Sequence, residues 1–88
     1  IGYMSGALKH AFDSIYYPCL TATIKAPYAL VVHGNADLSG GVRSVETVAG
    51  ALQWTRVHAP VEVIGSPDRV ALDLARELGS TLAAAVLP

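Results

Sequence analysis

One short apolar run limits what this chain can fold into more than any other feature. After Pro27 the sequence reads Tyr-Ala-Leu-Val-Val-His over residues 28–33, with no Asp, Glu, Lys or Arg and with several branched and aromatic side chains. A strand with one solvent-exposed face alternates apolar and polar residues, whereas residues 28–33 show no such alternation. Strands that are apolar on both faces belong inside parallel sheets with helices on either side. The run therefore predicts an α/β fold.

Helical and extended patterns alternate around this strand. Apolar residues recur at steps of three and four over residues 8–16, 42–52 and 71–86, which predicts three helices. A shorter strand is expected at residues 61–64, after Pro60, which favours an edge position. The order helix, strand, helix, strand, helix predicts parallel strands joined by right-handed crossovers.

Particular residues are expected to bound the helices. Ser5 is the candidate N-cap of the first helix, and Pro18 should stop it. Ser39 is the candidate cap of the second helix, which should run to about Arg56. Ser66 is expected to cap the third helix, ahead of a proline at the first helical position.

The composition indicates that much of this chain is covered by further polypeptide. Hydrophobic residues make up 52% of the 88 residues and charged residues 15%, where about 25% charged is usual. A short chain has a large surface for its volume and should need more polar residues, not fewer. Two strands also leave an edge and apolar helix faces uncovered.

Two arrangements would cover that surface. The chain could form a homo-oligomer through the open edge of residues 28–33. Alternatively, residues 1–88 are the carboxy-terminal part of a single domain whose amino-terminal half is missing, which the start at Ile1 rather than Met supports. We expect one of the two.

Charge and cysteine content exclude several classes. The formal net charge is −1 and the six Lys and Arg are scattered, so neither nucleic acid nor a membrane surface is an expected partner. No apolar run approaches the ~20 residues of a membrane span. Cys19 is the single cysteine and is expected to be a small buried hydrophobe, and no Cys/His spacing predicts a metal site. A cytoplasmic protein is expected. Tyr16, Tyr17 and Trp54 are assigned to packing.

Two Gly-rich loops are the candidate ligand-binding segments. In open α/β sheets ligands lie at the carboxyl ends of the strands, which here means residues 1–6 and 33–41. Glycines let the backbone approach a flat or anionic ligand, and amides at a helix start can donate to it. Tight turns alone would explain the same glycines equally well.

The first loop and the helix after it carry a resemblance. Residues 1–13, Ile-Gly-Tyr-Met-Ser-Gly-Ala-Leu-Lys-His-Ala-Phe-Asp, resemble the segment after the third strand of flavodoxin-like, NAD(P)H-dependent FMN reductases. That family has a proline, a short Gly-containing loop, Leu-Lys, a Phe and an Asp. The proline would precede Ile1, and Ser14 stands where an Arg often follows. Residues 29–41 are similar to the family's fourth strand and its flavin-contacting loop. The rest of the chain matches in element order only.

This resemblance implies a flavodoxin-like, three-layer α/β/α domain, of which this chain holds the helix-strand-helix-strand-helix portion. It implies an oxidoreductase that passes electrons or hydride from NAD(P)H through FMN. The family's phosphate-binding loop follows its first strand and would lie before Ile1, so the 88 residues alone should bind FMN weakly or not at all. No catalytic residue is assigned.

The resemblance also implies where the flavin lies. The first loop would flank the isoalloxazine ring, with Tyr3 stacked on it, and the second would contact the other edge. His33, Asn35 and Asp37 are the polar candidates, although Asn35 and Asp37 could equally only close a turn and His33 could equally only hydrogen-bond locally. The candidate cofactor-binding residues are Gly2, Tyr3, Met4, Ser5, Gly6, His33, Gly34, Asn35, Asp37 and Gly40.

Two other functions remain open. The chain could be a non-catalytic assembly module whose apolar surface is simply an interface. Residues 30–35, Leu-Val-Val-His-Gly-Asn, also resemble the strand and His-Gly oxyanion loop of α/β-hydrolases. That chemistry needs a Gly-x-Ser-x-Gly elbow, which the sequence lacks, so a hydrolase fragment is the weaker alternative.

Overall fold

The computed structural model describes residues 2–87 and shows a small α/β protein. Its helices are α1 (Gly6–Cys19), α2 (Ser39–Ala51) and α3 (Arg69–Val86). Its strands are β1 (Pro27–Tyr28), β2 (Val31–Gly34), β3 (Thr55–Arg56) and β4 (Val61–Ile64). Both strand pairings, β1 with β3 and β2 with β4, are parallel. The expected order of helical and extended segments is confirmed.

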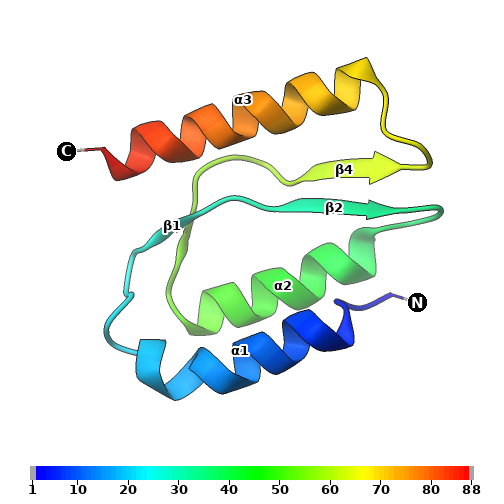
Figure 1. Cartoon of the computed structure of the whole chain (residues 1–88). Coiled ribbons are helices and arrows are strands. Elements are labelled where there is room, and N and C mark those ends of the chain that lie inside the picture. The colour runs from blue at the N-terminus through cyan, green and yellow to red at the C-terminus, as the bar shows by residue number, and fades with distance from the viewer. Residues whose placement is uncertain (1, 88) are drawn as a thin grey trace.

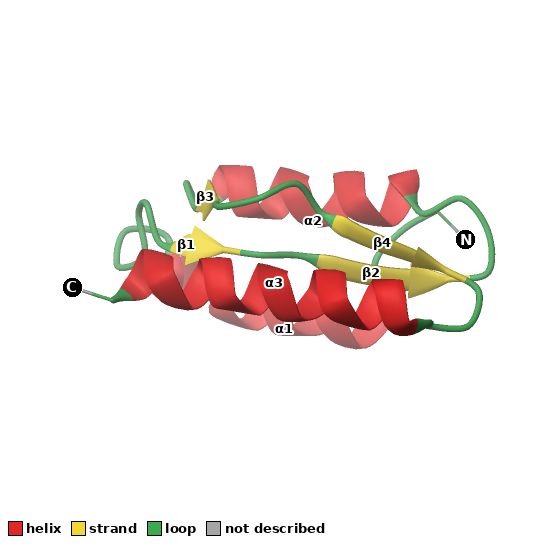
Figure 2. Ribbon diagram, turned by 90° about the horizontal axis from the view of Figure 1, so that it is seen from above, coloured by secondary structure: helices red, strands yellow, loops and turns green. Residues whose placement is uncertain are grey.

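Helices lie on both sides of the strands. Figure 1 shows α3 on one side and α1 with α2 on the other, and Figure 2 shows β2 and β4 side by side between α2 and α3. All three helices begin at the end of the molecule where β2 and β4 finish. The loops that lead into the helices are therefore gathered at the carboxyl ends of these strands.

The strand pairing is interrupted in the middle. Tyr28 lies opposite Arg56, and the next paired stretch begins three residues later at Val31 but five residues later at Val61. The segment between Arg56 and Val61 is therefore two residues longer than the segment between Tyr28 and Val31. It includes Pro60, which has no N–H to donate to the ladder. The continuous strand predicted over residues 28–33 is wrong, because its partner changes register there.

The two outer edges of the β2–β4 pair differ. The carbonyls of Leu30 and Gly34 accept hydrogen bonds from the β4 side at 3.0 and 2.8 Å. Neighbouring residues of a strand direct their backbone groups to opposite edges, so the N–H and C=O groups of Val31 and His33 point away from β4. Within residues 2–87, no other strand pairs with β2 on that side. The outer edge of β4 carries the charged Glu62, whereas β2 has no charged residue.

The buried core lies mainly between α1, α2 and the strands. It is formed by Met4, Phe12, Val45 and Leu52, and Leu52 is fully buried. Trp54 packs against it: its ring centroid is 6.0 Å from that of Phe12, as its packing assignment predicted. The burial expected for the apolar strand is not reached, because no residue of β2 is fully buried.

α1 begins as predicted but does not end as predicted. The Ser5 hydroxyl accepts the N–H of Leu8 at 3.2 Å and caps the helix. Pro18 lies inside the last turn, and the helix runs to Cys19. A proline near the end of a helix loses little, because few backbone bonds remain to be broken. Cys19 is half-buried against the core.

The tyrosines of α1 behave differently from one another. Tyr16 packs against the core, as expected. Tyr17 is 82% exposed and meets only the edge of the Tyr16 ring among the aromatic pairs, at 5.3 Å between centroids. Its assignment to packing is therefore wrong, because it points outward from the helix.

α2 is shorter than the sequence pattern predicted. Ser39 is its first residue rather than its cap, and the helix ends at Ala51 instead of near Arg56. Gln53 adopts a left-handed conformation with φ of 59°, and the N–H of Trp54 bonds to the carbonyl of Ala49 at 2.9 Å. This is a Schellman end, which closes the helix and turns the chain toward β3.

α3 is capped two residues later than expected. The carboxylate of Asp68, not Ser66, accepts the N–H of Ala71 at 2.8 Å. Leu78 is buried against the strands, but Leu74 and Val86 on the predicted buried face are exposed. Two strands are too narrow to cover the apolar face of an 18-residue helix.

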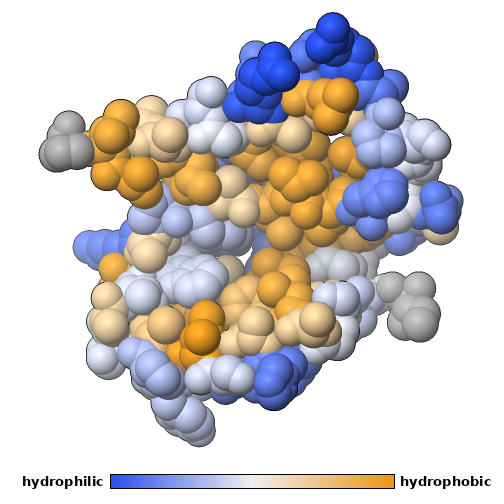
Figure 3. Space-filling view, viewed as in Figure 1, coloured by the Kyte–Doolittle hydropathy of each residue, from blue (hydrophilic) through white to orange (hydrophobic). Residues whose placement is uncertain are grey.

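The exposed part of α3 leaves apolar surface on the outside of the molecule. Figure 3 shows such surface in orange over α3 and the strands beneath it.

Within residues 2–87, every helix is too short or too polar to cross a bilayer.

Candidate functional site

The loop before α1 is fastened to α2. Met4 donates its N–H to the Oγ of Ser44 at 3.0 Å, and the Ser44 hydroxyl donates to the carbonyl of Gly41 at 2.8 Å. The Met4 side chain is buried in the core. Among the candidate cofactor-binding residues, Met4 therefore anchors the loop, and its side chain lies in the core. Ile1, the first residue of that loop, lies outside the described residues.

The two Gly-rich loops touch through their glycines. A Cβ on Gly40 would lie 2.6 Å from the carbonyl carbon of Gly2, which is closer than real Cβ atoms come to backbone. A Cβ on Gly34 would lie 2.7 Å from a methyl group of Leu38. Gly40 is therefore required by the contact between the loops, whereas Gly34 faces a side chain that can move.

A surface cavity of about 300 Å³ opens beside this contact. Tyr3, which is 50% exposed, borders it. Ligand pockets commonly measure roughly 300–1,000 Å³, so this cavity is at the small end of that range. The lining residues are Gly2, Tyr3, Gly40, Arg43, Ser44, Thr47 and Val48.

Sequence reasoning missed Arg43 and Ser44 in this cavity. Both lie within the first two turns of α2, one residue apart, on the side that meets the loop before α1. Helical spacing from Ser39 could have placed them near the loop, but nothing in the sequence indicated which face of α2 that loop meets. Arg43 brings a positive charge to the cavity.

Asp37 organises the turn between β2 and α2. Its carboxylate oxygens accept the N–H and the hydroxyl of Ser39, each at 3.0 Å. The hydrogen bond from the Ser39 amide, and then that from its hydroxyl, lower the pKa of Asp37 below its usual range. Both oxygens are therefore engaged in the turn. Asn35 is exposed in the same loop, as Asp37 is.

His33 reaches from β2 to the loop after β4. Its Nε2 lies 2.7 Å from the carbonyl oxygen of Gly65, and a carbonyl can only accept. The Nε2 atom of His33 is therefore occupied by a hydrogen bond to the backbone. Its position at the carboxyl end of β2 places it at the same end of the molecule as the two Gly-rich loops.

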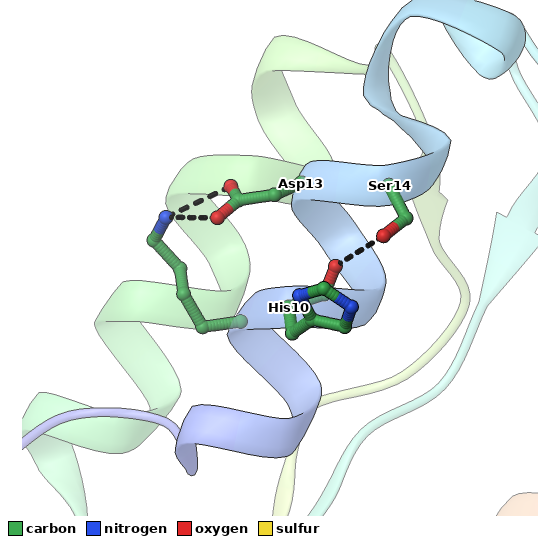
Figure 4. A network of polar contacts seen from close by, with 4 residues as sticks. His10, Asp13 and Ser14 are labelled. Atoms are coloured by element: carbon green, nitrogen blue, oxygen red, sulfur yellow. Dashed lines mark hydrogen bonds and ion pairs between the residues drawn. The ribbon is translucent and has the colours of Figure 1, made fainter.

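Ser5 and Gly6 shape the start of α1. Ser5 is its cap, and Gly6 is its first residue, with open space where a Cβ would stand. The next turn is an exposed polar surface: Lys9 and Asp13 form an i, i+4 ion pair at 2.8 Å, shown in Figure 4. The hydrogen bond to Asp13 raises the pKa of Lys9.

A second, larger surface cavity lies away from these loops and is lined by polar residues. It measures about 710 Å³ and lies between α3 and the segment after β3. Its lining residues are His58, Asp73, Arg76, Glu77, Ser80 and Thr81. Over residues 2–87, no group of three or more His, Cys, Asp or Glu side chains is arranged to hold a metal ion.

Comparisons with known proteins did not identify a relative. No protein-family model matches the sequence, and neither the curated proteins nor the solved structures include a match.

Proposed function

We propose that residues 2–6 and 33–41 form the isoalloxazine side of an FMN site in a flavodoxin-like oxidoreductase that uses NAD(P)H. The observation that carries the proposal is the contact between the two Gly-rich loops beside the carboxyl end of β2, next to an exposed Tyr3 and a cavity. Bound FMN would supply the hydride and electron chemistry itself. The protein would supply the position of the ring and its polar surroundings.

Several residues suit a flat, polar ring. The exposed ring of Tyr3 offers a stacking surface, and the amides of Gly40 and Gly41 lie in the first turn of α2, where helix amides are free to donate. Asn35 offers an exposed amide side chain in the second loop. Helices on both sides of parallel strands also support a three-layer, flavodoxin-like arrangement.

Titration of the ¹⁵N-labelled chain with FMN to millimolar concentration tests the proposal. Weak binding should shift the amide signals of residues 2–6 and 34–41 first, and Tyr3→Ala should reduce those shifts, whereas Tyr17→Ala on the outside of α1 should not. Adenosine monophosphate, which has a phosphate but no flavin, is the matched ligand control. Shifts that lie outside these loops, or that adenosine monophosphate reproduces, would refute the flavin site.

The open edge of β2 favours a second proposal, which concerns partners. We propose that two copies of the chain associate through residues 28–33. An exposed strand edge without charged residues is a template for pairing with another strand. Val31, in the middle of this edge, is 48% exposed, and Leu72 of α3 stands exposed beside it, lining the same small cavity. An assembly module without flavin would use the same edge.

A further inference from the structure

We propose that His33 is a positioning residue: its imidazole fastens the loop after β4 to the loop after β2 and so holds the second Gly-rich loop in place. The consequence for flavin rests on the proposed function, but the fastening itself does not. His33 Nε2 donates to the carbonyl of Gly65 at 2.7 Å, and the Gly65 N–H donates to the carbonyl of Gly34 at 2.8 Å. One glycine is thus held through both of its backbone groups by two consecutive residues.

The register of the strands brings these groups together. His33 lies opposite Val63 in the parallel ladder, so Gly65 is two residues beyond the pair. Gly65 has φ of +79°, a conformation that a residue with a Cβ rarely adopts, and there the chain leaves β4. Pro67 follows and lines a cavity of about 170 Å³ together with the His33 ring. The ring therefore rests against the loop that it fastens.

The chemistry of the contact sets the tautomer. Because the Gly65 carbonyl has no proton to give, Nε2 must carry the hydrogen, both in neutral imidazole and in imidazolium. Nδ1 is left without a role in the fastening. A ring used for direct flavin contact would have to offer Nδ1 or its face.

The position of Gly34 links the fastening to the candidate site. Gly34 is the last residue of β2, and the loop to α2 begins directly after it. The Gly34 carbonyl accepts the N–H of Gly65, so greater motion at Gly65 should also increase motion at the start of the loop between β2 and α2. Removing the imidazole should therefore loosen residues 34–38 without removing a group that touches the ligand.

A flavin-free experiment tests the fastening. We expect Nε2-protonated imidazole in the ¹⁵N spectrum of His33, and His33→Leu should raise amide exchange at Gly65, whose N–H is bonded to Gly34, by about tenfold, the factor that corresponds to one hydrogen bond of ~1.4 kcal/mol. His33→Gln, whose amide can donate to the same carbonyl, should restore much of the protection. His10→Leu, on the exposed side of α1, is the matched control and should change nothing there.

Three results would overturn the inference. A δ-protonated neutral ring, unchanged exchange in His33→Leu, or a Gln variant that exchanges as fast as the Leu variant would each show that the imidazole does not fasten Gly65.

An FMN titration separates positioning from contact. If His33 only positions the loop, FMN should leave the ¹⁵Nδ1 signal unmoved while it shifts the amides of the loops. A large ¹⁵Nδ1 shift would mean that the ring touches flavin and would overturn the positioning role. If FMN shifts only amides outside the two loops, the proposed function fails, and the flavin-free results still decide the fastening.

Discussion

Met4 donates its backbone N–H to the Oγ of Ser44 across 3.0 Å, although the two residues are 40 positions apart in the chain. This bond attaches the loop before α1 to the body of α2. Ser44→Ala would leave the partly buried Met4 amide without an acceptor, so the free energy of unfolding should fall by about 1 kcal/mol. Urea unfolding of Ser44→Ala and of the original chain measures this decrease in the free energy of unfolding. Ser80→Ala, also in a helix but exposed, should lose nothing and corrects for helix propensity.

Two neighbouring glycines should respond to alanine with opposite signs. Gly40→Ala would press a methyl group into the backbone of Gly2 and should destabilise the protein by about 1–3 kcal/mol. At Gly41 the new Cβ would meet the Tyr3 carbonyl at an ordinary 3.8 Å, so Gly41→Ala should gain up to ~1 kcal/mol of helix propensity. Thermal unfolding of both variants measures the difference. Equal effects would show that the loops do not touch at Gly40.

Gln53 is a site for stabilisation. Its φ of 59° closes α2, and glycine adopts this conformation without the steric cost that a Cβ carries. Gln53→Gly should raise the free energy of unfolding by about 1 kcal/mol. Gln53→Ala keeps the Cβ and should bring no such gain. A Gly variant that is no more stable than the Ala variant would contradict the left-handed end of the helix.

The turn at Asp37 should weaken in acid. Because hydrogen bonds from Ser39 lower the pKa of this carboxyl in the folded chain, its ionised form favours folding. That contribution is complete above the unfolded pKa of about 4 and is lost as the pH falls through the lower folded pKa. A ¹³C titration of the Asp37 carboxyl should give a pKa below the usual range of an aspartate, and Ser39→Ala should raise it. A pKa that stays unchanged in Ser39→Ala would exclude the hydroxyl as a cause.

A charge on the open edge should keep the chain monomeric. We expect sedimentation to show self-association of the original chain, and Val31→Lys should shift it to monomer, because two like charges would face each other across the joined edges. Val70→Lys, at an exposed position beside the outer edge of β4, is the matched control and should still associate. A monomeric original chain would refute the proposed partner surface.

Local patterns accounted for the order of the elements and for much of the interior. The spacing of apolar residues placed all three helices, and Ser5 was identified as a cap because both the cap and its target amide lie within four residues of each other. The packing of Trp54 followed from its size and apolar character. These features depend on neighbours in the chain, which a sequence displays directly.

Features that depend on distant pairs were not predictable. The break between β1 and β2 arises because the partner strand changes register, and no residue of 28–33 signals this. Ser66 and Asp68 are both suitable caps by residue type, and the folded chain uses Asp68. In the candidate site, Tyr3 and Gly40 were identified from the loops, but Ser44 depends on a contact across 40 residues.

The unequal edges of the β2–β4 pair bear on how far assembly can proceed. When two copies join through β2, each presents its β4 edge outward, with the charge of Glu62 on it and Pro60 just before it. Both residues oppose the addition of another strand. Growth would therefore terminate at a closed pair, and fibres built by repeated strand addition would not follow from this surface.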